Sequence, residues 1–153
     1  MSDARLTVTL ERLFELAVML NASMDQGLAE RRLTPARAEL LWVLSRQATP
    51  TQRELSQLLR CTPRNVTDLV DSLETAGLVR REPHPRDRRA TLVSLTRRGK
   101  SEVARMQAGS AALAATLFDG LTETDLGTFA AVVNHILRKL QQLATAGDNA
   151  QAL

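Results

Sequence analysis

The stretch from Thr62 to Thr96 constrains the fold more than any other part of this chain. It begins with Thr62 and Pro63, which suit the N-cap and the first position of a helix. Gly77 suits the left-handed residue that often ends a helix. Between these ends, apolar residues recur at the spacing of one helical face: Val66, Leu69, Val70 and Leu73. The stretch therefore predicts a short helix that buries one face and exposes a polar one.

A basic hairpin is predicted directly after this helix. Residues 78–82 and 90–95 alternate well enough to form short antiparallel strands, and the loop 83–89 between them is rich in proline and arginine. From Arg80 to Lys100 there are eight basic and two acidic residues, a net +6, whereas the formal net charge of the whole chain is +3. The positive charge is thus concentrated here. A polar helix beside a basic hairpin is typical of a winged helix-turn-helix that binds DNA.

The composition fits a chain that folds mainly into helices. Of its 153 residues, 44% are hydrophobic but only 3% are aromatic, so leucine, valine and alanine must fill the core. The single cysteine, Cys61, excludes an internal disulfide framework. No signal peptide and no apolar run of membrane-spanning length are recognisable, so we expect a cytoplasmic protein with no membrane partner.

Further helices are predicted before the central stretch. Residues 6–28 form a long amphipathic pattern, and 31–33 a short connector. Thr34 and Pro35 begin a helix that runs to about Arg46. Thr51 and Glu54 have the spacing of a capping box, which begins a helix over 51–60 with Leu55, Leu58 and Leu59 expected to be buried. This helix and the one after Thr62 form the expected helix-turn-helix.

Two helices are predicted after the hairpin. Thr96 is expected to cap a long helix that ends near Gly120, and Thr122 and Asp125 to cap a last helix running to about Leu143. Residues 144–153 are expected to be a frayed tail. The fold class is thus mainly α with a small antiparallel β-hairpin. Residues 1–33 would be a dimerisation helix, 34–96 the winged helix-turn-helix, and 97–153 further dimerisation helices with the tail.

A homodimer is predicted from the apolar faces at both ends of the chain, because the winged helix-turn-helix alone does not need them. Two-fold symmetry would place two reading helices about one DNA turn apart, matching a palindromic operator. The residues expected at the dimer interface are Leu6, Leu10, Leu13, Phe14, Leu126, Phe129, Val133, Leu137 and Leu140.

Base contacts are expected from the first turn of the reading helix. Arg64 can pair with guanine and Asn65 with adenine, although both could also be plain solvated surface residues. Asp68 could hold Arg64 one turn back, which we favour, or accept a hydrogen bond from cytosine. Phosphate contacts are expected from five residues in or before the reading helix: Gln52, Arg53, Thr62, Pro63 and Thr67.

The hairpin tip is expected to enter the minor groove. Arg86, Arg88 and Arg89 have the length and charge for this, although a run of charges is often only a solvated face. Asp87 more plausibly orients an arginine than contacts DNA. His84 could touch a phosphate or play no part in binding.

Residues 34–99 resemble the MarR family of bacterial transcription factors, most specifically in the Asp87-Arg88-Arg89 sequence and the VSLTxxG passage that follows it. The resemblance implies an obligate homodimer with interlocked terminal helices, a wing arginine in the minor groove, and an Asp87–Arg89 pairing. It also implies transcriptional regulation, usually repression, that a small molecule or an oxidant relieves. Asp68 departs from the basic or small residue expected at its position.

The effector remains undefined by the sequence. The redox branch of the family relies on a cysteine in the first helix, which this chain lacks, and Cys61 is better interpreted as a small buried turn residue than as a sensor. A ligand pocket lined by Trp42, Met19 or His135 is conceivable, but no polar constellation identifies one, and Trp42 is more readily a core residue.

Two other functions were weighed. An enzyme is disfavoured, because His84 and His135 lie on different elements and the sequence has no metal-binding, cofactor-binding or nucleophile motif. A winged-helix module that binds only proteins would not need so dense a cluster of arginines. Salt dependence separates this alternative from DNA binding.

Overall fold

The computed structural model describes residues 3–47, 49–87 and 89–151, and the side chains through residue 144. These residues form six helices and one hairpin. The elements are α1 (Asp3–Glu30), α2 (Pro35–Arg46), α3 (Gln52–Leu58), α4 (Pro63–Thr75), β1 (Val79–Pro83), β2 (Thr91–Leu95), α5 (Arg97–Leu117) and α6 (Glu123–Gln151). The chain divides into two compact units, Met1–Gly109 and Ser110–Leu153. The predicted fold class is confirmed.

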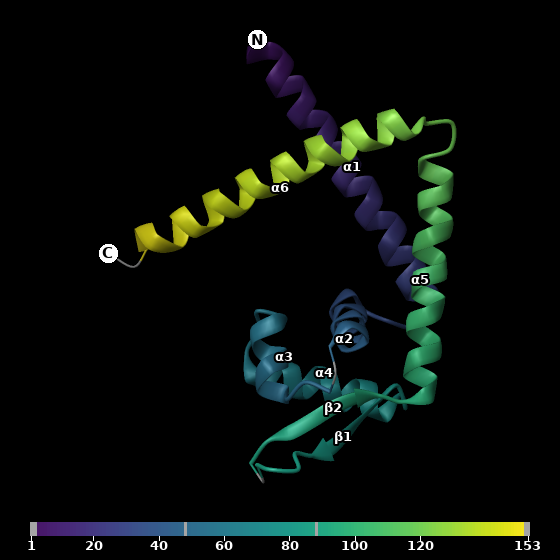
Figure 1. Cartoon of the computed structure of the whole chain (residues 1–153), viewed down its shortest axis with the longest axis vertical. Helices are drawn as coiled ribbons and strands as arrows, with labels where there is room; N and C mark the ends of the chain where they lie inside the picture. The colour runs from purple at the N-terminus through teal and green to yellow at the C-terminus, as the bar shows by residue number, and fades with distance from the viewer. Residues whose placement is uncertain (1–2, 48, 88, 152–153) are drawn as a thin grey trace. The chain divides into compact units, whose positions relative to one another are not determined.

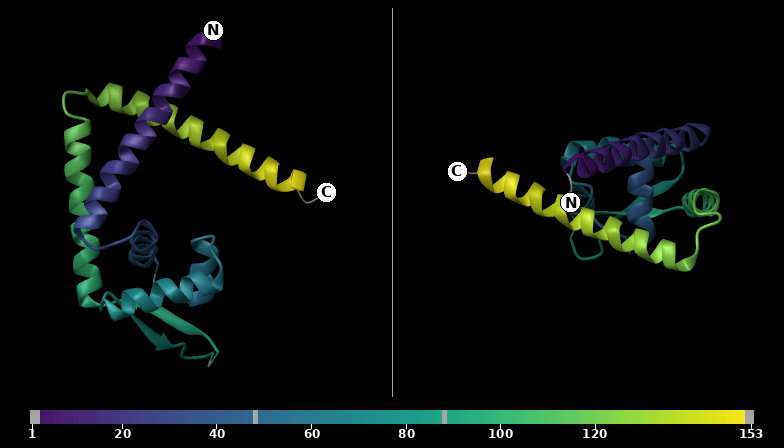
Figure 2. Two further views of the ribbon diagram at one scale, coloured as in Figure 1. Left: turned by 180° about the vertical axis from the view of Figure 1, so that it is seen from behind. Right: turned by 90° about the horizontal axis from the view of Figure 1, so that it is seen from above.

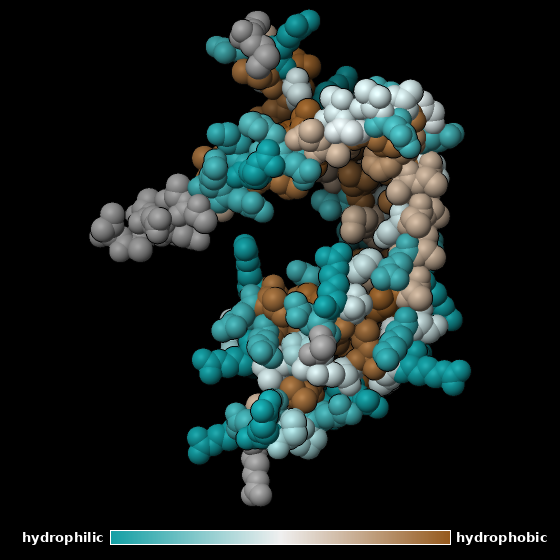
Figure 3. All heavy atoms as spheres, in the orientation of Figure 1, coloured by the Kyte–Doolittle hydropathy of each residue, from teal (hydrophilic) through white to brown (hydrophobic). Residues whose placement is uncertain are grey.

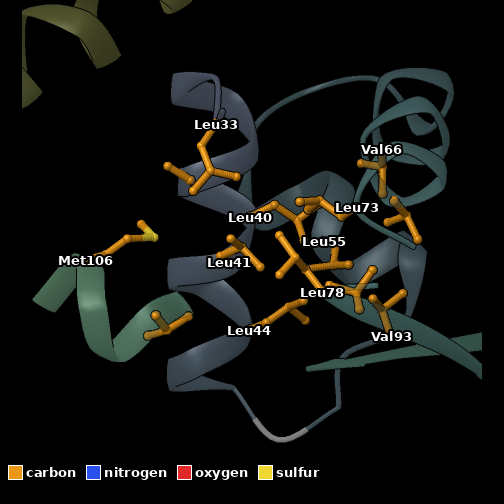
Figure 4. Packing of buried hydrophobic residues seen from close by; sticks show 14 residues of the cluster. Leu33, Leu40, Leu41, Leu44, Leu55, Val66, Leu73, Leu78, Val93 and Met106 are labelled. Carbon is orange, nitrogen blue, oxygen red and sulfur yellow. The ribbon is translucent and has the colours of Figure 1, made fainter. Parts of the chain in front are cut away.

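The first unit is built around a core contributed by α2, α3, α4, the hairpin and the start of α5. Figure 4 shows leucine and valine side chains from these elements converging on one another, with Leu40 and Leu41 on α2 facing Leu55 and Leu73. All four of these leucines are 0% exposed. Trp42 is half-buried and packs against this core, as expected.

The helix-turn-helix has the predicted capping. Thr51 and Glu54 form a complete capping box at the start of α3, and Thr62 Oγ1 accepts a hydrogen bond from the Asn65 backbone N–H, 3.2 Å away, at the start of α4. Gly77 has φ +71° and follows the end of α4. The side chains of Thr51, Glu54 and Thr62 satisfy backbone N–H groups that the start of a helix leaves unpaired.

The hairpin packs against the helix-turn-helix and projects beyond it, as Figure 1 and the left view of Figure 2 show. Its antiparallel register pairs Val79 with Leu95 and Pro83 with Thr91. A single β-bridge joins Thr51 to Leu92, and the Val93 N–H donates to the Pro50 carbonyl at 2.9 Å. The start of α3 is thereby attached to the wing.

The passage from β2 to α5 is a tight junction. The Thr96 hydroxyl lies 2.7 Å from the Gly77 carbonyl and 3.2 Å from that of Leu78, and Thr96 Oγ1 accepts from the Gly99 N–H at 3.0 Å. A Cβ on Gly99 would collide with the Leu78 carbonyl oxygen. Only glycine fits at position 99, because α5 starts directly against the residue that follows the end of the reading helix.

The terminal helices leave their apolar faces open. No residue of α1 is buried, and no described side chain of α6 is buried. Hydrophobic residues reach the surface along α1 in the space-filling view of Figure 3. Within the second unit, the Phe118 and Phe129 rings lie 6.2 Å apart, centroid to centroid, across the turn between α5 and α6.

Three predictions of local structure were wrong. The last helix does not end at Leu143 but continues to Gln151, although Gly147, Asp148 and Asn149 have low helix propensity. The tail predicted from 144 is thus helical through 151, and residues 152–153 lie outside the described part. The third helix ends at Leu58 and not near Arg60. Leu58 is exposed, because so short a helix turns only Leu55 fully inward. Both strands begin one residue later than predicted: β1 because Leu78 belongs to the turn that ends α4, and β2 because the Ala90 N–H donates to the Asp87 carbonyl within the loop.

Candidate nucleic-acid interface

The reading helix α4 has one buried face and one polar exposed face. Val66, Val70 and Leu73 are 0% exposed and fix the helix on the core. The residues predicted to meet bases, Arg64, Asn65 and Asp68, are exposed on the other face. A rigidly held helix that presents arginine and asparagine in its first turn has the chemistry for reading base edges in a major groove.

Two threonines of this helix are engaged in its own structure. Thr62 serves as the N-cap, and the Thr67 hydroxyl donates to the Pro63 carbonyl at 3.0 Å. Thr62, Pro63 and Thr67 are nonetheless exposed and remain candidates for phosphate contacts. The favoured role of Asp68 is not seen, because the ion pairs within the described residues include none between Asp68 and Arg64.

Arg81 on β1 joins the wing to the reading helix. Its guanidinium makes ion pairs with Asp71 at 2.5 Å and with Glu74 at 2.6 Å, and it donates to the Thr67 carbonyl at 3.5 Å. Burial opposes the charge on Arg81, yet the hydrogen bonds and charges of Glu74 and Asp71 outweigh it and raise the pKa of Arg81. Arg81 is thus a structural residue, a role that the sequence analysis missed by counting it only as wing charge.

The charge available on the wing is further reduced at Arg80. Its Nε lies 3.0 Å from Glu82 Oε1 and donates to Ser94 Oγ at 3.1 Å. The hairpin tip keeps Arg86 and Arg89 exposed and without ion pairs to the described residues. The net +6 counted in the sequence therefore overstates the positive charge that the described wing presents to DNA.

His84 organises the wing tip. Its Nδ1 accepts hydrogen bonds from the backbone N–H groups of Arg86 at 3.2 Å and Asp87 at 3.1 Å. Because Nδ1 is an acceptor, the neutral ring carries its proton on Nε2. The structure thus gives His84 a definite role in shaping the loop, which neither interpretation of the sequence included.

Asp87 also orders the loop, although its side chain makes no ion pair with any of the described arginines. Its Oδ1 accepts from the backbone N–H of Arg89 at 2.9 Å, and its carbonyl accepts from the Ala90 N–H at 3.1 Å. The Asp87–Arg89 pairing is therefore a backbone contact that leaves the Arg89 guanidinium exposed. Arg88, the third predicted wing arginine, lies outside the described residues.

The start of α3 forms the remaining part of the surface. Glu54 accepts from the Thr51 N–H at 2.7 Å and from the Thr51 hydroxyl at 2.8 Å, and these bonds lower the pKa of Glu54. Arg53 is exposed beside this cap. Gln52 is half-buried, and its amide nitrogen has no hydrogen-bond partner, so it has an unused donor at the helix start.

Left-handed arginines at two helix ends were not predicted from the sequence. Arg60, between α3 and α4, has φ +50°, and Arg32, after α1, has φ +56°. Each follows the hydrogen-bond pattern that Gly77 shows after α4, with the next N–H donating to a carbonyl five residues back: Cys61 to Ser56, Leu33 to Leu28 and Leu78 to Leu73. Arg60 is exposed in the turn before the reading helix, which adds it to the candidate DNA contacts.

Comparisons with known proteins define the class of this molecule. The MarR family model matches residues 33–91. The HTH-type transcriptional repressor MdtR of Bacillus subtilis is 30% identical over 97% of this chain and 90% of its own. The chain therefore belongs to the MarR family, a family of transcription regulators and not of enzymes.

Solved structures agree with the fold. The YusO protein of Bacillus subtilis has a TM-score of 0.75 at 27% identity, covering 93% of this chain and 99% of its own. A mutant of S. aureus MepR, bound to an oligodeoxyribonucleotide, has a TM-score of 0.66 at 24% identity, covering 86% of this chain and 97% of its own. Within the described residues, no helix combines the length and the apolar character needed to cross a membrane.

Proposed function

We propose that two copies of this chain bind a palindromic DNA operator and repress transcription, inserting α4 of each copy into a major groove. One observation supports this most strongly. Helix α4 is fixed by side chains that are 0% exposed, while Arg64 and Asn65 extend into solvent from its first turn. A packing role would not require this polar face, whereas base readout does.

The relatives support the same function. MdtR carries the name of a transcriptional repressor, and the MepR structure holds an oligodeoxyribonucleotide. By extension, this chain acts on DNA in the cytoplasm as a repressor.

The proposed contacts divide by chemistry. Arg64 and Asn65 read bases, with Asp68 beside them. Residues around the start of α3 and α4, all exposed except the half-buried Gln52, contact phosphates. These phosphate contacts are Gln52, Arg53, Thr62, Pro63 and Thr67. Arg86 and Arg89, held on a loop ordered by His84 and Asp87, enter the minor groove, and by sequence we include Arg88.

The homodimer is proposed because apolar side chains on α1 and α6 are exposed. Phe14 is 63% exposed on α1 and Leu140 is 56% exposed on α6. A second copy would cover these faces with the same faces of its own, as a two-fold interface requires. The proposed interface comprises Leu6, Leu10, Leu13, Phe14, Leu126, Phe129, Val133, Leu137 and Leu140.

Release of the operator by a small-molecule effector completes the proposal. A cavity of about 420 Å³ supports it, because it lies where the end of α2, the base of the hairpin and the start of α5 meet. Leu44, Arg80 and Lys100 are among its lining residues, whereas Trp42, Met19 and His135 are not. A ligand there would contact both the wing and the helix that leads away from it.

Operator binding by the Arg64→Ala variant tests the function. Footprinting on the DNA that flanks the gene would first define the operator, and competition with random duplex would follow. We expect Arg64→Ala to lose about 1–3 kcal/mol on the operator and almost nothing on random DNA, because only base contacts depend on sequence. Arg138→Ala on α6 removes the same charge from an exposed site and should change neither affinity.

Two outcomes would contradict the proposal. Equal losses on operator and random DNA would place Arg64 among the phosphate contacts. No binding to duplex at low salt would exclude DNA as the partner, since phosphate neutralisation gives its strongest affinity there and a steep decline as salt rises.

A further inference from the structure

A second cavity, lined by arginines, lies away from the proposed DNA contacts. It has a volume of about 350 Å³ and is bounded by the connector between α1 and α2, the end of α4 and the first turns of α5. All of these segments belong to the first compact unit. The volume is within the range that accommodates a small molecule.

The cavity is strongly positive. Of the described residues that line it, five are arginines and one is acidic: Arg31, Arg32, Arg37, Arg98, Arg105 and Glu102. Their net charge of +4 exceeds the +3 of the entire chain. Like charges brought together from segments distant in sequence repel one another, and a bound anion would reverse that energy.

Glu102 neutralises only part of this charge. Its carboxylate lies 3.3 Å from Arg31 Nη1 and 3.3 Å from Arg105 Nη1, and Arg31 Nη2 also donates to the Arg105 carbonyl at 3.2 Å. These contacts fix the wall formed by α5 and the end of α1. The other three arginines make no ion pair with the described residues, which leaves three guanidinium groups for a ligand.

Arg32 is held at the cavity in an unfavourable backbone conformation. Its φ of +56° places it at the left-handed position that ends α1, where glycine is the ordinary residue. A side chain is disfavoured there, because a Cβ crowds the following carbonyl oxygen in this conformation. One of the three unpaired arginines thus lines the cavity at a position whose backbone conformation favours glycine.

The remaining walls are apolar and connect the cavity to the reading helix. Leu73 and Ala76 at the end of α4 line it, together with Leu33 and Leu78. Leu78 also accepts from the Thr96 N–H at 3.0 Å in the junction that starts α5. A ligand in the cavity would thus have apolar contact as well as charge pairing.

We propose that this cavity is a binding site for a small multivalent anion, a polycarboxylate or a phosphate ester. Both groups are planar or tetrahedral arrays of oxygens that accept paired hydrogen bonds from guanidinium, and two or more negative charges match the three unpaired arginines. The assignment does not depend on DNA binding, because the free chain would bind the anion.

Calorimetric titration of the full chain with citrate and, separately, with pyrophosphate tests the site at constant ionic strength. We expect saturable binding of one anion per chain and much weaker binding of acetate, which carries one charge. Tighter binding of citrate would identify polycarboxylates as the ligand class of this cavity, and tighter binding of pyrophosphate would identify phosphate esters. Saturation by neither anion would show that the cavity is only a solvated group of arginines.

The Arg32→Gly, Arg37→Gln double variant identifies the site. Glycine suits the left-handed position, so the variant should fold at least as stably as the natural chain. Its dissociation constant for the better anion should rise by at least about tenfold, as expected when charge-assisted hydrogen bonds are removed. The Arg138→Gln, Lys139→Gln double variant removes two charges from exposed sites on α6; it is the matched control and should bind the anion normally.

Two results with these variants would overturn the assignment. Unchanged anion affinity in the double variant would place binding elsewhere. Weaker binding of the double variant to duplex DNA, with no anion present, would mean that DNA phosphates are the occupant of these arginines.

Discussion

The winged-helix core and the terminal helices use similar apolar patterns but differ in what covers them. In the core, Leu41 and Val70 are 0% exposed. On α1, Phe14 and Val18 are 63% and 68% exposed, although the amphipathic pattern there is as long as any in the chain. Burying a large apolar side chain contributes roughly 1.5–3 kcal/mol. The core is therefore complete within the first unit, whereas burial of the apolar faces of the terminal helices is left to the homodimer proposed above.

The largest effect is expected within the winged-helix core, at the start of α5. Gly99→Ala would drive a methyl group into the Leu78 carbonyl oxygen, so the backbone must shift. We expect the free energy of unfolding to fall by more than about 4 kcal/mol, or the chain not to fold. Urea unfolding followed by circular dichroism measures it.

Gly127→Ala is the control for this variant, because nothing lies within 4 Å of the added methyl in α6. It should increase stability by about 0.5–1 kcal/mol through helix propensity. Similar behaviour of the two variants would mean that the close approach at Gly99 does not constrain the fold.

Two large-to-small substitutions, one in the core and one on α1, distinguish the energetics of the two regions directly. Leu41→Ala should lower the free energy of unfolding by about 2–5 kcal/mol at every protein concentration, because it creates a cavity in a closed core. Phe14→Ser should instead weaken the homodimer, so its melting temperature should fall at micromolar concentration and lose its dependence on concentration. If the melting temperatures of the two variants depended on protein concentration in the same way, the core and α1 would not differ in their need for a second chain.

The ion pairs of Arg81 with Asp71 and Glu74, which clamp the wing to the reading helix, should have an intermediate effect. Arg81→Gln leaves Asp71 and Glu74 without their ion-pair partner, and we expect a loss of about 1–2 kcal/mol in stability. Operator affinity should also fall, although Arg81 touches no DNA in this account. Arg80→Gln, which removes the more exposed neighbour, should have less effect on stability. A larger loss from Arg80→Gln would argue against the clamp.

A smaller effect of opposite sign is expected at the turn of the helix-turn-helix. Arg60→Gly should raise the free energy of unfolding by about 0.5–1 kcal/mol, because φ +50° suits glycine. Gly77→Ala, at φ +71°, should lower it by a similar amount. Chemical denaturation would measure both, and destabilisation by Arg60→Gly would show that the arginine side chain has a packing role.

The smallest effect concerns acid stability, and it is shared by both regions. Thr51 lowers the pKa of Glu54 on α3 through backbone and hydroxyl hydrogen bonds, and Thr122 lowers that of Asp125 on α6 through hydroxyl and backbone hydrogen bonds. A carboxyl with a lowered pKa in the folded state stabilises the fold at higher pH, and this stabilisation disappears as pH falls below roughly 4.

Glu54→Gln and Asp125→Asn should therefore each flatten the decline in stability between roughly pH 5 and pH 3, with little difference from the natural chain at the acid end. Unfolding curves at stepped pH would measure this. A decline as steep as that of the natural chain would exclude these capping boxes as its source.

Local chemistry predicted most of the fold. Thr62, Gly77 and the Thr51–Glu54 pair have few structural alternatives, and the helices begin and end beside them. Arg32 and Arg60 were missed because arginine carries no signal for the left-handed position at which each helix ends. The role of Arg81 was missed for a similar reason, since which acidic residues lie opposite β1 depends on packing and not on spacing.

The proposed DNA site was predicted less completely. Exposure of Arg64 and Asn65 followed from the helical period. The hydrogen bonds from the wing backbone to His84 could not be predicted, because they depend on the loop conformation around Pro85.

Sedimentation equilibrium of the full chain, with and without a labelled operator duplex, measures the stoichiometry on which the proposed function depends. We expect two chains in the free protein and two chains per duplex. A stable monomer at micromolar concentration, or one chain per duplex, would contradict it.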